Sequence, residues 1–291
     1  MSIVEYFALF PYLQVFIIKG KMVLRTYFDK NNTIVYNNVT NTGLNPVTEL
    51  FYGGRDAENK YSRFLFYFDE TRLKDLYTGG TYTDLTKLKH TLKLTNTGAF
   101  DESLLGKTTC SGKDRTCSFD LILFSIDQPW DEGCGYDYDG CTYLGNPATT
   151  SLGPSNWVDA ETNTPWSGGN GTYTGSTTPL ATIHFDKGNE NLDLDITDIV
   201  NGYLTGATNY GLGLAYSRTL ELTETSNYQY VGFFTRHTQT FYEPFVETVY
   251  ECHIKDDRAN FYLDKLNKLY LYSNLGGEPT NLDVLPSVDI K

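Results

Sequence analysis

The sequence predicts an all-β protein, specifically a jelly-roll β-sandwich with one or two short helices and a C-terminal β-hairpin extension. Short segments rich in aromatic and β-branched residues recur along the chain, and turns rich in Gly, Asn, Asp and Thr separate them. The chain has 23 Tyr and 17 Phe, which supply apolar side chains for a large core. Short strands at this spacing are typical of sandwiches and jelly rolls.

Each expected strand follows from its composition or its alternation. The run 61–69 is almost continuously apolar, as in a strand that is buried on both faces. The run 90–96 alternates with a period of two, which places Leu92 and Leu94 on one face and polar residues on the other. The remaining strands are expected at 24–28, 33–36, 49–52, 119–126, 182–185, 210–217, 229–235 and 245–250.

Two short helices are expected between the strands. Residues 70–76 fit one or two helical turns. A second helix follows residue 195, because Asp195 or Thr197 can cap it and Gly206 can end it. Its apolar residues share one face: Ile199, Val200, Tyr203 and Leu204.

Near the C-terminus, residues 260–264 and 268–273 alternate about a turn, which predicts a hairpin. A helix over 261–272 is the alternative, because Leu263, Leu266 and Tyr270 have helical spacing.

The composition excludes several classes of protein. A formal charge of −13 argues against nucleic-acid binding, which usually needs a basic patch. The apolar run 6–18 is interrupted by Pro11 and Gln14, and it is shorter than the ~20 residues that span a bilayer, so we expect no membrane partner. It also lacks the features of a signal peptide. Because strand-like patterning begins at Val23, we interpret residues 1–21 as an apolar leader, with Met22 as a candidate start.

Four of the five cysteines form two pairs with the same spacing. Cys110 and Cys117 enclose six residues, as do Cys134 and Cys141. Under oxidising conditions we expect a disulfide in each pair; free thiols are the alternative in a reducing cytosol. Zinc is disfavoured because its ligand pairs usually enclose two to four residues.

Acidic residues gather between 127 and 140, where no Lys or Arg interrupts them. Hard cations prefer several oxygen ligands, so this loop is a candidate Ca²⁺ site. A solvated acidic loop is the alternative, and no other cofactor is expected. The candidate ligands are Asp131, Glu132, Asp137 and Asp139.

The tryptophans and two arginines also stand out. Trp130, Trp157 and Trp166 are candidate platforms for stacking on a sugar, and packing in the core is the alternative. Arg63 and Arg236 lie inside apolar strands, so we expect them to form structural ion pairs with carboxylates such as Asp69 or Glu243.

Several short sequence motifs occur along the chain in the order that a known family shows. Residues 63–69 with Leu73, the pair Asn156-Trp157 before Trp166, and then 194–206, 209–214 and 233–246 together resemble a DNRLRE-type jelly-roll domain, a family similar to a class of carbohydrate-binding modules. The resemblance covers residues 22–250 and implies a jelly roll. The chain departs from the family at Tyr203, where Trp is usual, and in a long insertion at 127–179.

Two further phrases narrow the resemblance. Trp130-Asp-Glu-Gly133 followed by Gly135-Tyr-Asp-Tyr138, and residues 235–244, resemble versions of this domain in virion structural proteins of tailed phages. Residues 267–290 resemble the lead-in to a further immunoglobulin-like domain, so residues 251–291 are expected to form a hairpin and a linker strand towards such a domain or a partner. The resemblance implies a non-enzymatic tail, collar or fibre component that assembles in the host cytoplasm. Its partners would be other virion proteins, copies of itself in a homo-oligomer, and a cell-surface glycan. The alternatives are an extracellular carbohydrate-binding module of a bacterial polysaccharide-processing protein and, third, a polysaccharide-cleaving enzyme.

Overall fold

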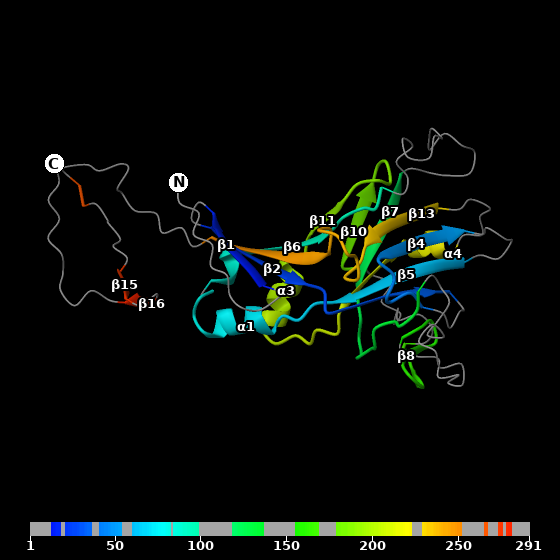
Figure 1. The fold of residues 1–291 in the computed structure, drawn as a ribbon, viewed down its shortest axis with the longest axis horizontal. Helices are drawn as coiled ribbons and strands as arrows, with labels where there is room; N and C mark the ends of the chain where they lie inside the picture. The colour runs from blue at the N-terminus through cyan, green and yellow to red at the C-terminus, as the bar shows by residue number, and fades with distance from the viewer. Residues whose placement is uncertain are drawn as a thin grey trace.

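The computed structural model confirms the all-β prediction: the chain forms antiparallel sheets consistent with a β-sandwich of the jelly-roll kind (Figure 1). The ranges that the structure describes are 13–18, 21–36, 41–53, 60–82, 84–98, 118–136, 155–168, 179–222, 229–251, 265–266, 273–275 and 278–280.

The first main sheet has five strands in the order β1-β2-β14-β6-β11. They are β1 (Leu13–Ile18), β2 (Lys21–Tyr27), β14 (Phe245–Glu251), β6 (Leu88–Leu94) and β11 (Leu192–Asp195). Buried and more exposed residues alternate along β6 as the sequence predicts, with Leu92 and Leu94 buried. On the other face of this sheet, Lys93 pairs with Asp193 across strands at 2.8 Å.

The second main sheet has seven strands. Six follow the order β10-β7-β12-β5-β4-β13, and β3 also pairs with β5. They are β10 (Ala181–Phe185), β7 (Phe119–Ser125), β12 (Leu212–Tyr216), β5 (Lys60–Tyr67), β4 (Val47–Gly53), β13 (Gln229–Phe234) and β3 (Lys30–Val35). The consecutive residues Phe64, Leu65 and Phe66 of β5 are all fully buried, which confirms a strand covered on both faces.

Short helices connect and cover the sheets. Both predicted helices are present, as α1 (Thr71–Thr78) and α3 (Thr197–Leu204), and they contact each other. Asp195 accepts a hydrogen bond from the Thr197 N–H (3.0 Å) at the start of α3, and Gly206 follows its end with φ +115°. The sequence did not predict α4 (Arg218–Leu222) or the 3₁₀ turn η1 (Leu85–Lys87).

One apolar cluster joins both sheets and α3. Side chains from β2, β6 and β14 meet side chains from β7, β12 and β13 in it. The fully buried members include Leu24, Leu92, Val246, Leu121, Leu214 and Phe233. This continuous core holds the loops at each end of the sandwich on a rigid base.

The N-terminal boundary differs from the sequence prediction. Residues 13–18, expected in a leader, form β1 and pair with β2 from Leu13↔Thr26 to Ile18↔Lys21. Within the described residues, the sheet therefore includes Leu13–Ile18, ahead of Val23. Nearly every residue of the run 6–18 is apolar, so it shows no period-two alternation that would have identified a strand.

The described residues also form two small two-stranded sheets. β8 (Asp159–Glu161) pairs with β9 (Thr164–Pro165), and β15 (Ser273–Leu275) pairs with β16 (Glu278–Thr280). The hairpin predicted over 260–273 lies outside the described residues, apart from 265, 266 and 273. Among the described residues, no helix is long and apolar enough to cross a bilayer.

Candidate functional site

The three tryptophans predicted as sugar platforms are buried. Trp130 is 2% exposed, and Trp157 and Trp166 are each 3% exposed. The indole N–H of Trp130 donates to the Tyr210 carbonyl (2.7 Å), and that of Trp166 donates to the Asn156 carbonyl (2.8 Å). A sugar stacks only on an open ring face, so the packing alternative holds and the prediction of sugar platforms at these positions is corrected.

Trp157 packs against a buried ion pair. Arg63 donates to both carboxylate oxygens of Glu221, from Nε (2.9 Å) and from Nη2 (2.8 Å), and each side chain is only 2% exposed. The guanidinium carbon lies 4.7 Å from the Trp157 ring centre, and Arg218 adds a second cation at 3.2 Å from Glu221. The predicted partner Asp69 is wrong, because its carboxylate accepts hydrogen bonds at the start of α1.

A second ion pair joins two loops to the start of β3, and we call this group the loop junction: Asn31, Glu132, Arg236 and His237. Glu132 accepts hydrogen bonds from Arg236 Nη1 (2.7 Å) and from the Asn31 N–H (3.1 Å), and its other contact is to His237 Nε2 (3.1 Å). The Asn31 side chain in turn accepts the Arg236 N–H at 3.0 Å. Glu243 was the predicted partner of Arg236, and the structure replaces it with Glu132.

The electrostatics of Glu132 follow from these contacts. Burial alone would raise the pKa of its carboxyl, but the hydrogen bonds from His237, Arg236 and Asn31 outweigh burial, so the pKa lies below its usual value. The adjacent Gly133 lies so close to the Asn32 side chain and the Gly43 backbone that a Cβ there would collide with both. The junction is therefore tightly packed and charged at neutral pH.

The predicted calcium ligands do not come together in the described residues. The Glu132 carboxylate already contacts Arg236 and His237, so its oxygens are not available to bind a metal ion. The Asp131 side chain is exposed. In the described part of the chain, no group of three or more acidic, His or Cys side chains is arranged to hold a metal ion. Asp137 and Asp139 lie outside the described residues, so a site built on them stays a prediction.

Of the predicted disulfide cysteines, Cys134 is disulfide-bonded. Cys110, Cys117 and Cys141 lie outside the described residues. The pairing of Cys134 with Cys141, and of Cys110 with Cys117, stays a prediction.

Next to the loop junction is an exposed segment that we call the aromatic loop, residues 238–242. Phe241 is completely exposed, at 104% of its reference area. The ring of Tyr242 stacks on that of Phe234, with centres 5.1 Å apart and planes at 23°. Single exposed aromatic side chains are common on folded proteins, and Phe241 is one that a partner can reach.

Hydrogen bonds fix the chain just before the aromatic loop, and one more lies within the loop. Thr235 Oγ1 donates to the Asn45 carbonyl (2.6 Å), and the Thr238 N–H donates to the Thr235 carbonyl (3.1 Å). The Tyr242 N–H donates to Thr240 Oγ1 (3.2 Å). The sequence patterns do not distinguish Phe241, although two adjacent aromatic residues between predicted strands are a usable signal.

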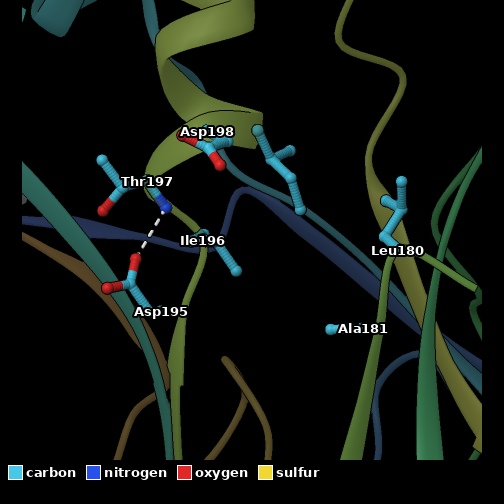
Figure 2. A pocket seen from close by; sticks show the side chains of 7 residues that line it. Leu180, Ala181, Asp195, Ile196, Thr197 and Asp198 are labelled. Atoms are coloured by element: carbon cyan, nitrogen blue, oxygen red, sulfur yellow. Dashed lines mark hydrogen bonds between the residues drawn. The ribbon is translucent and has the colours of Figure 1, made fainter.

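A cleft of about 300 Å³ opens elsewhere on the sandwich, and we call it the edge cleft (Figure 2). It lies between the start of β10 and the start of α3, where β10 and β11 are outermost in their sheets. Its apolar lining comes from Leu180, Ala181, Ile196 and Ile199, and its polar lining from Asp195, Thr197 and Asp198. Leu180 is 47% exposed.

A polar cluster on β7 and β10 has the residue types of a hydrolase. His184 Nδ1 lies 2.7 Å from Asp120, and its Nε2 lies 3.2 Å from Ser118. However, the Asp186 carboxylate also lies 3.2 Å from Nε2. The hydrogen bond with Asp120, together with the charges of both aspartates, raises the pKa of His184, which favours the imidazolium. His184 is thus bound between two aspartates on an exposed surface, and we interpret the arrangement as an ion-pair cluster.

The fold and these surface features define the class of protein: an all-β sandwich with an aromatic loop beside the Arg236–Glu132 ion pair and a cleft between two sheet edges. In comparisons with protein-family models and with curated proteins, nothing matches this chain.

Proposed function

We propose that this protein is a non-enzymatic structural component of a tailed-phage particle, in its tail, collar or fibre, that acts in particle assembly or host-surface attachment. The observation that carries the proposal is the aromatic loop, which exposes all of Phe241 shortly after Thr235 and Arg236, two residues that are bonded to the body of the protein. A contact segment whose base is fixed loses less conformational freedom on binding than a free one.

The resemblance supports the proposal at the same place. The two phrases that resemble phage virion proteins, residues 130–133 and 235–244, are brought together by the contact between Glu132 and Arg236. In this proposal the loop junction supports the surface that meets a partner, either another virion protein, a further copy of the chain, or a glycan of the host surface.

One observation favours a second candidate, an extracellular carbohydrate-binding module of a bacterial polysaccharide-processing protein. Cys134 is disulfide-bonded, and disulfides persist mainly in oxidising environments outside the cytosol. In this alternative the glycan contact falls to exposed aromatic residues such as Phe241 and Tyr242, because the tryptophans are buried.

Mass spectrometry of density-purified phage particles from the producing strain tests the proposal. We expect the protein in intact particles at a constant ratio to the major capsid protein across gradient fractions. The cell-free medium, cleared of particles, is the matched control. Recovery only from that medium would contradict the virion assignment and support the extracellular alternative.

A further inference from the structure

We propose that Lys74 and Asn209 form an intramolecular amide bond between their side chains, in a reaction in which Glu70 transfers protons and ammonia is released. The site lies where α1 meets the segment that follows α3, and the two helices contact each other (Figure 1). The inference goes beyond the proposed function, because the bond is a property of the folded chain and is tested on the purified protein.

One carboxylate holds both reacting groups. Lys74 Nζ donates to Glu70 Oε1 (2.6 Å), and Asn209 Nδ2 donates to Glu70 Oε2 (2.6 Å). An ordinary ion pair between residues four apart on a helix needs only the first of these contacts. The second contact brings the amide of a distant segment to the same carboxylate, so amine and amide are neighbours there. The flexible stem of Lys74 lets Nζ reach the amide carbon Cγ.

The Asn209 amide is oriented by further hydrogen bonds. Its Nδ2 also donates to the Phe68 carbonyl (3.0 Å), and its Oδ1 accepts the Gly211 N–H (2.9 Å). The oxygen becomes negative when a nucleophile adds to Cγ, and an N–H donor already lies on it, as oxyanion stabilisation requires. The nitrogen, which must leave, faces the Glu70 carboxylate, which is the group that can protonate it.

The inner side of the site is poorly hydrated. The Glu70 side chain is 9% exposed, and Phe68 is fully buried. Burial, and after it the charge of Glu70, raises the pKa of the Tyr67 and Tyr203 phenols. Because burial penalises charged groups, a neutral amine beside a neutral carboxylic acid is more accessible here than in a fully exposed ion pair. The Lys74 side chain is 38% exposed, which leaves ammonia a path to solvent.

The reaction needs no other reagent. A proton passes from the Lys74 ammonium to Glu70, and the electron pair of Nζ then forms a bond to Asn209 Cγ while the C=O electron pair moves to Oδ1. Glu70 passes its proton to Nδ2 and takes one from Nζ. The C=O bond re-forms as the Cγ–Nδ2 bond breaks, so ammonia leaves with that electron pair and takes the last proton from Glu70. In total, an ammonium and a carboxamide give an amide and an ammonium ion, and Glu70 ends as a carboxylate.

The bond closes a covalent loop between α1 and the segment that enters β12. The loop contains β6, β7, β10, β11 and α3. A cross-link that closes a long loop restricts the unfolded chain, so it stabilises the fold independently of any disulfide.

Intact-mass spectrometry of the purified full chain, after reduction of disulfides, measures the reaction. We expect the natural protein to be lighter than its sequence mass by one ammonia molecule. Lys74→Arg keeps a cation but loses the nucleophile, and Glu70→Gln loses the proton carrier, so both should keep the full sequence mass. Lys87→Arg is the matched control, because Lys87 also forms an ion pair with a carboxylate three residues earlier, Asp84, and should leave the loss of ammonia unchanged.

Peptide mapping by tandem mass spectrometry identifies the bond itself. Succinimide formation at an Asn-Gly sequence, such as Asn201-Gly202, also releases ammonia but joins no peptides. We expect one joined peptide that contains both Lys74 and Asn209, in the natural protein and in Lys87→Arg only. Circular dichroism verifies that each variant folds, and if Glu70→Gln does not, Lys74→Arg decides alone, because its side chain is partly exposed.

Two outcomes would overturn the inference: a folded natural protein that keeps its full sequence mass after prolonged incubation, or a loss of ammonia that persists in folded Lys74→Arg without a joined peptide. Detection of the protein in phage particles does not depend on this bond, so failure of either proposal is recognised separately.

Discussion

Two Arg–Glu pairs with the same chemistry occupy opposite environments in this protein. The Arg63–Glu221 pair is 2% exposed on both sides, whereas the Arg236 and Glu132 side chains are 27% and 22% exposed. The shortest contact in each pair is almost the same, 2.8 and 2.7 Å. The contribution of an ion pair to stability therefore depends on its exposure to water and not on the distance between its atoms alone.

The buried pair is compatible with folding only because it is fully coordinated. Two charges removed from water each cost several kcal/mol, which mutual attraction offsets only with good geometry and further partners. Arg63 satisfies this through two hydrogen bonds to Glu221 and the face of Trp157, and Glu221 also contacts Arg218. The junction pair keeps partial hydration, and it connects loops instead of filling the core.

The largest effect expected from this comparison follows from Glu221→Gln. The neutral amide leaves the Arg63 charge buried without a counter-ion, so we expect the free energy of unfolding to fall by about 3–5 kcal/mol. Chemical denaturation followed by tryptophan fluorescence measures it. The double variant Arg63→Met/Glu221→Met is the control and should recover most of the loss, because it removes both charges. A loss of less than about 1 kcal/mol in Glu221→Gln would show that the pair is hydrated in solution.

The pH dependence of the free energy of unfolding distinguishes His90 in the core from Glu132 in the loop junction. Burial lowers the pKa of His90 to about 4, although the nearby Asp195 carboxylate opposes the shift. The unfolded chain takes up this proton near pH 6.5 and the folded chain only near pH 4, so stability is full above pH 6.5 and falls between these values. The expected loss is about 3 kcal/mol.

Denaturation curves at pH 7 and at pH 4.5 measure the His90 effect, and His90→Gln should lose most of it. Glu132 acts in a lower window: its pKa is depressed, so its contribution is present above its ordinary value of 4.5 and is lost as the pH falls through the folded pKa. A pH dependence above 4.5 that persists unchanged in His90→Gln would assign it to another group.

The smallest global effect is expected from Glu132→Gln. The side chain is partly hydrated, so we expect a loss of only about 1 kcal/mol, reduced further by salt. Its main consequence is local: hydrogen exchange of the amides at 236–242 should accelerate, while exchange in β5 stays unchanged. Uniform acceleration throughout the sandwich would contradict the assignment of Glu132 to loop anchoring.

Sequence patterns predicted the elements that local periodicity controls. The unbroken apolar run became the doubly buried β5, the alternation of 90–96 became β6, and the segment after Asp195 became α3. The patterns failed at β1, where nearly uniform apolarity hides the face that a strand buries, and at α4, whose five residues are too few for a helical period to be recognised.

The sequence by itself determined that the chain is a β-sandwich, that Arg63 and Arg236 need carboxylate partners, and that its abundant aromatic residues build a core. Only the tertiary structure decided which carboxylates serve, because Glu221 lies 158 residues from Arg63 along the chain, and Glu132 lies 104 residues from Arg236. It also decided that the tryptophans are buried and that Phe241 is exposed. Composition sets how much apolar surface must be covered, but exposure depends on which distant segments pack over each ring.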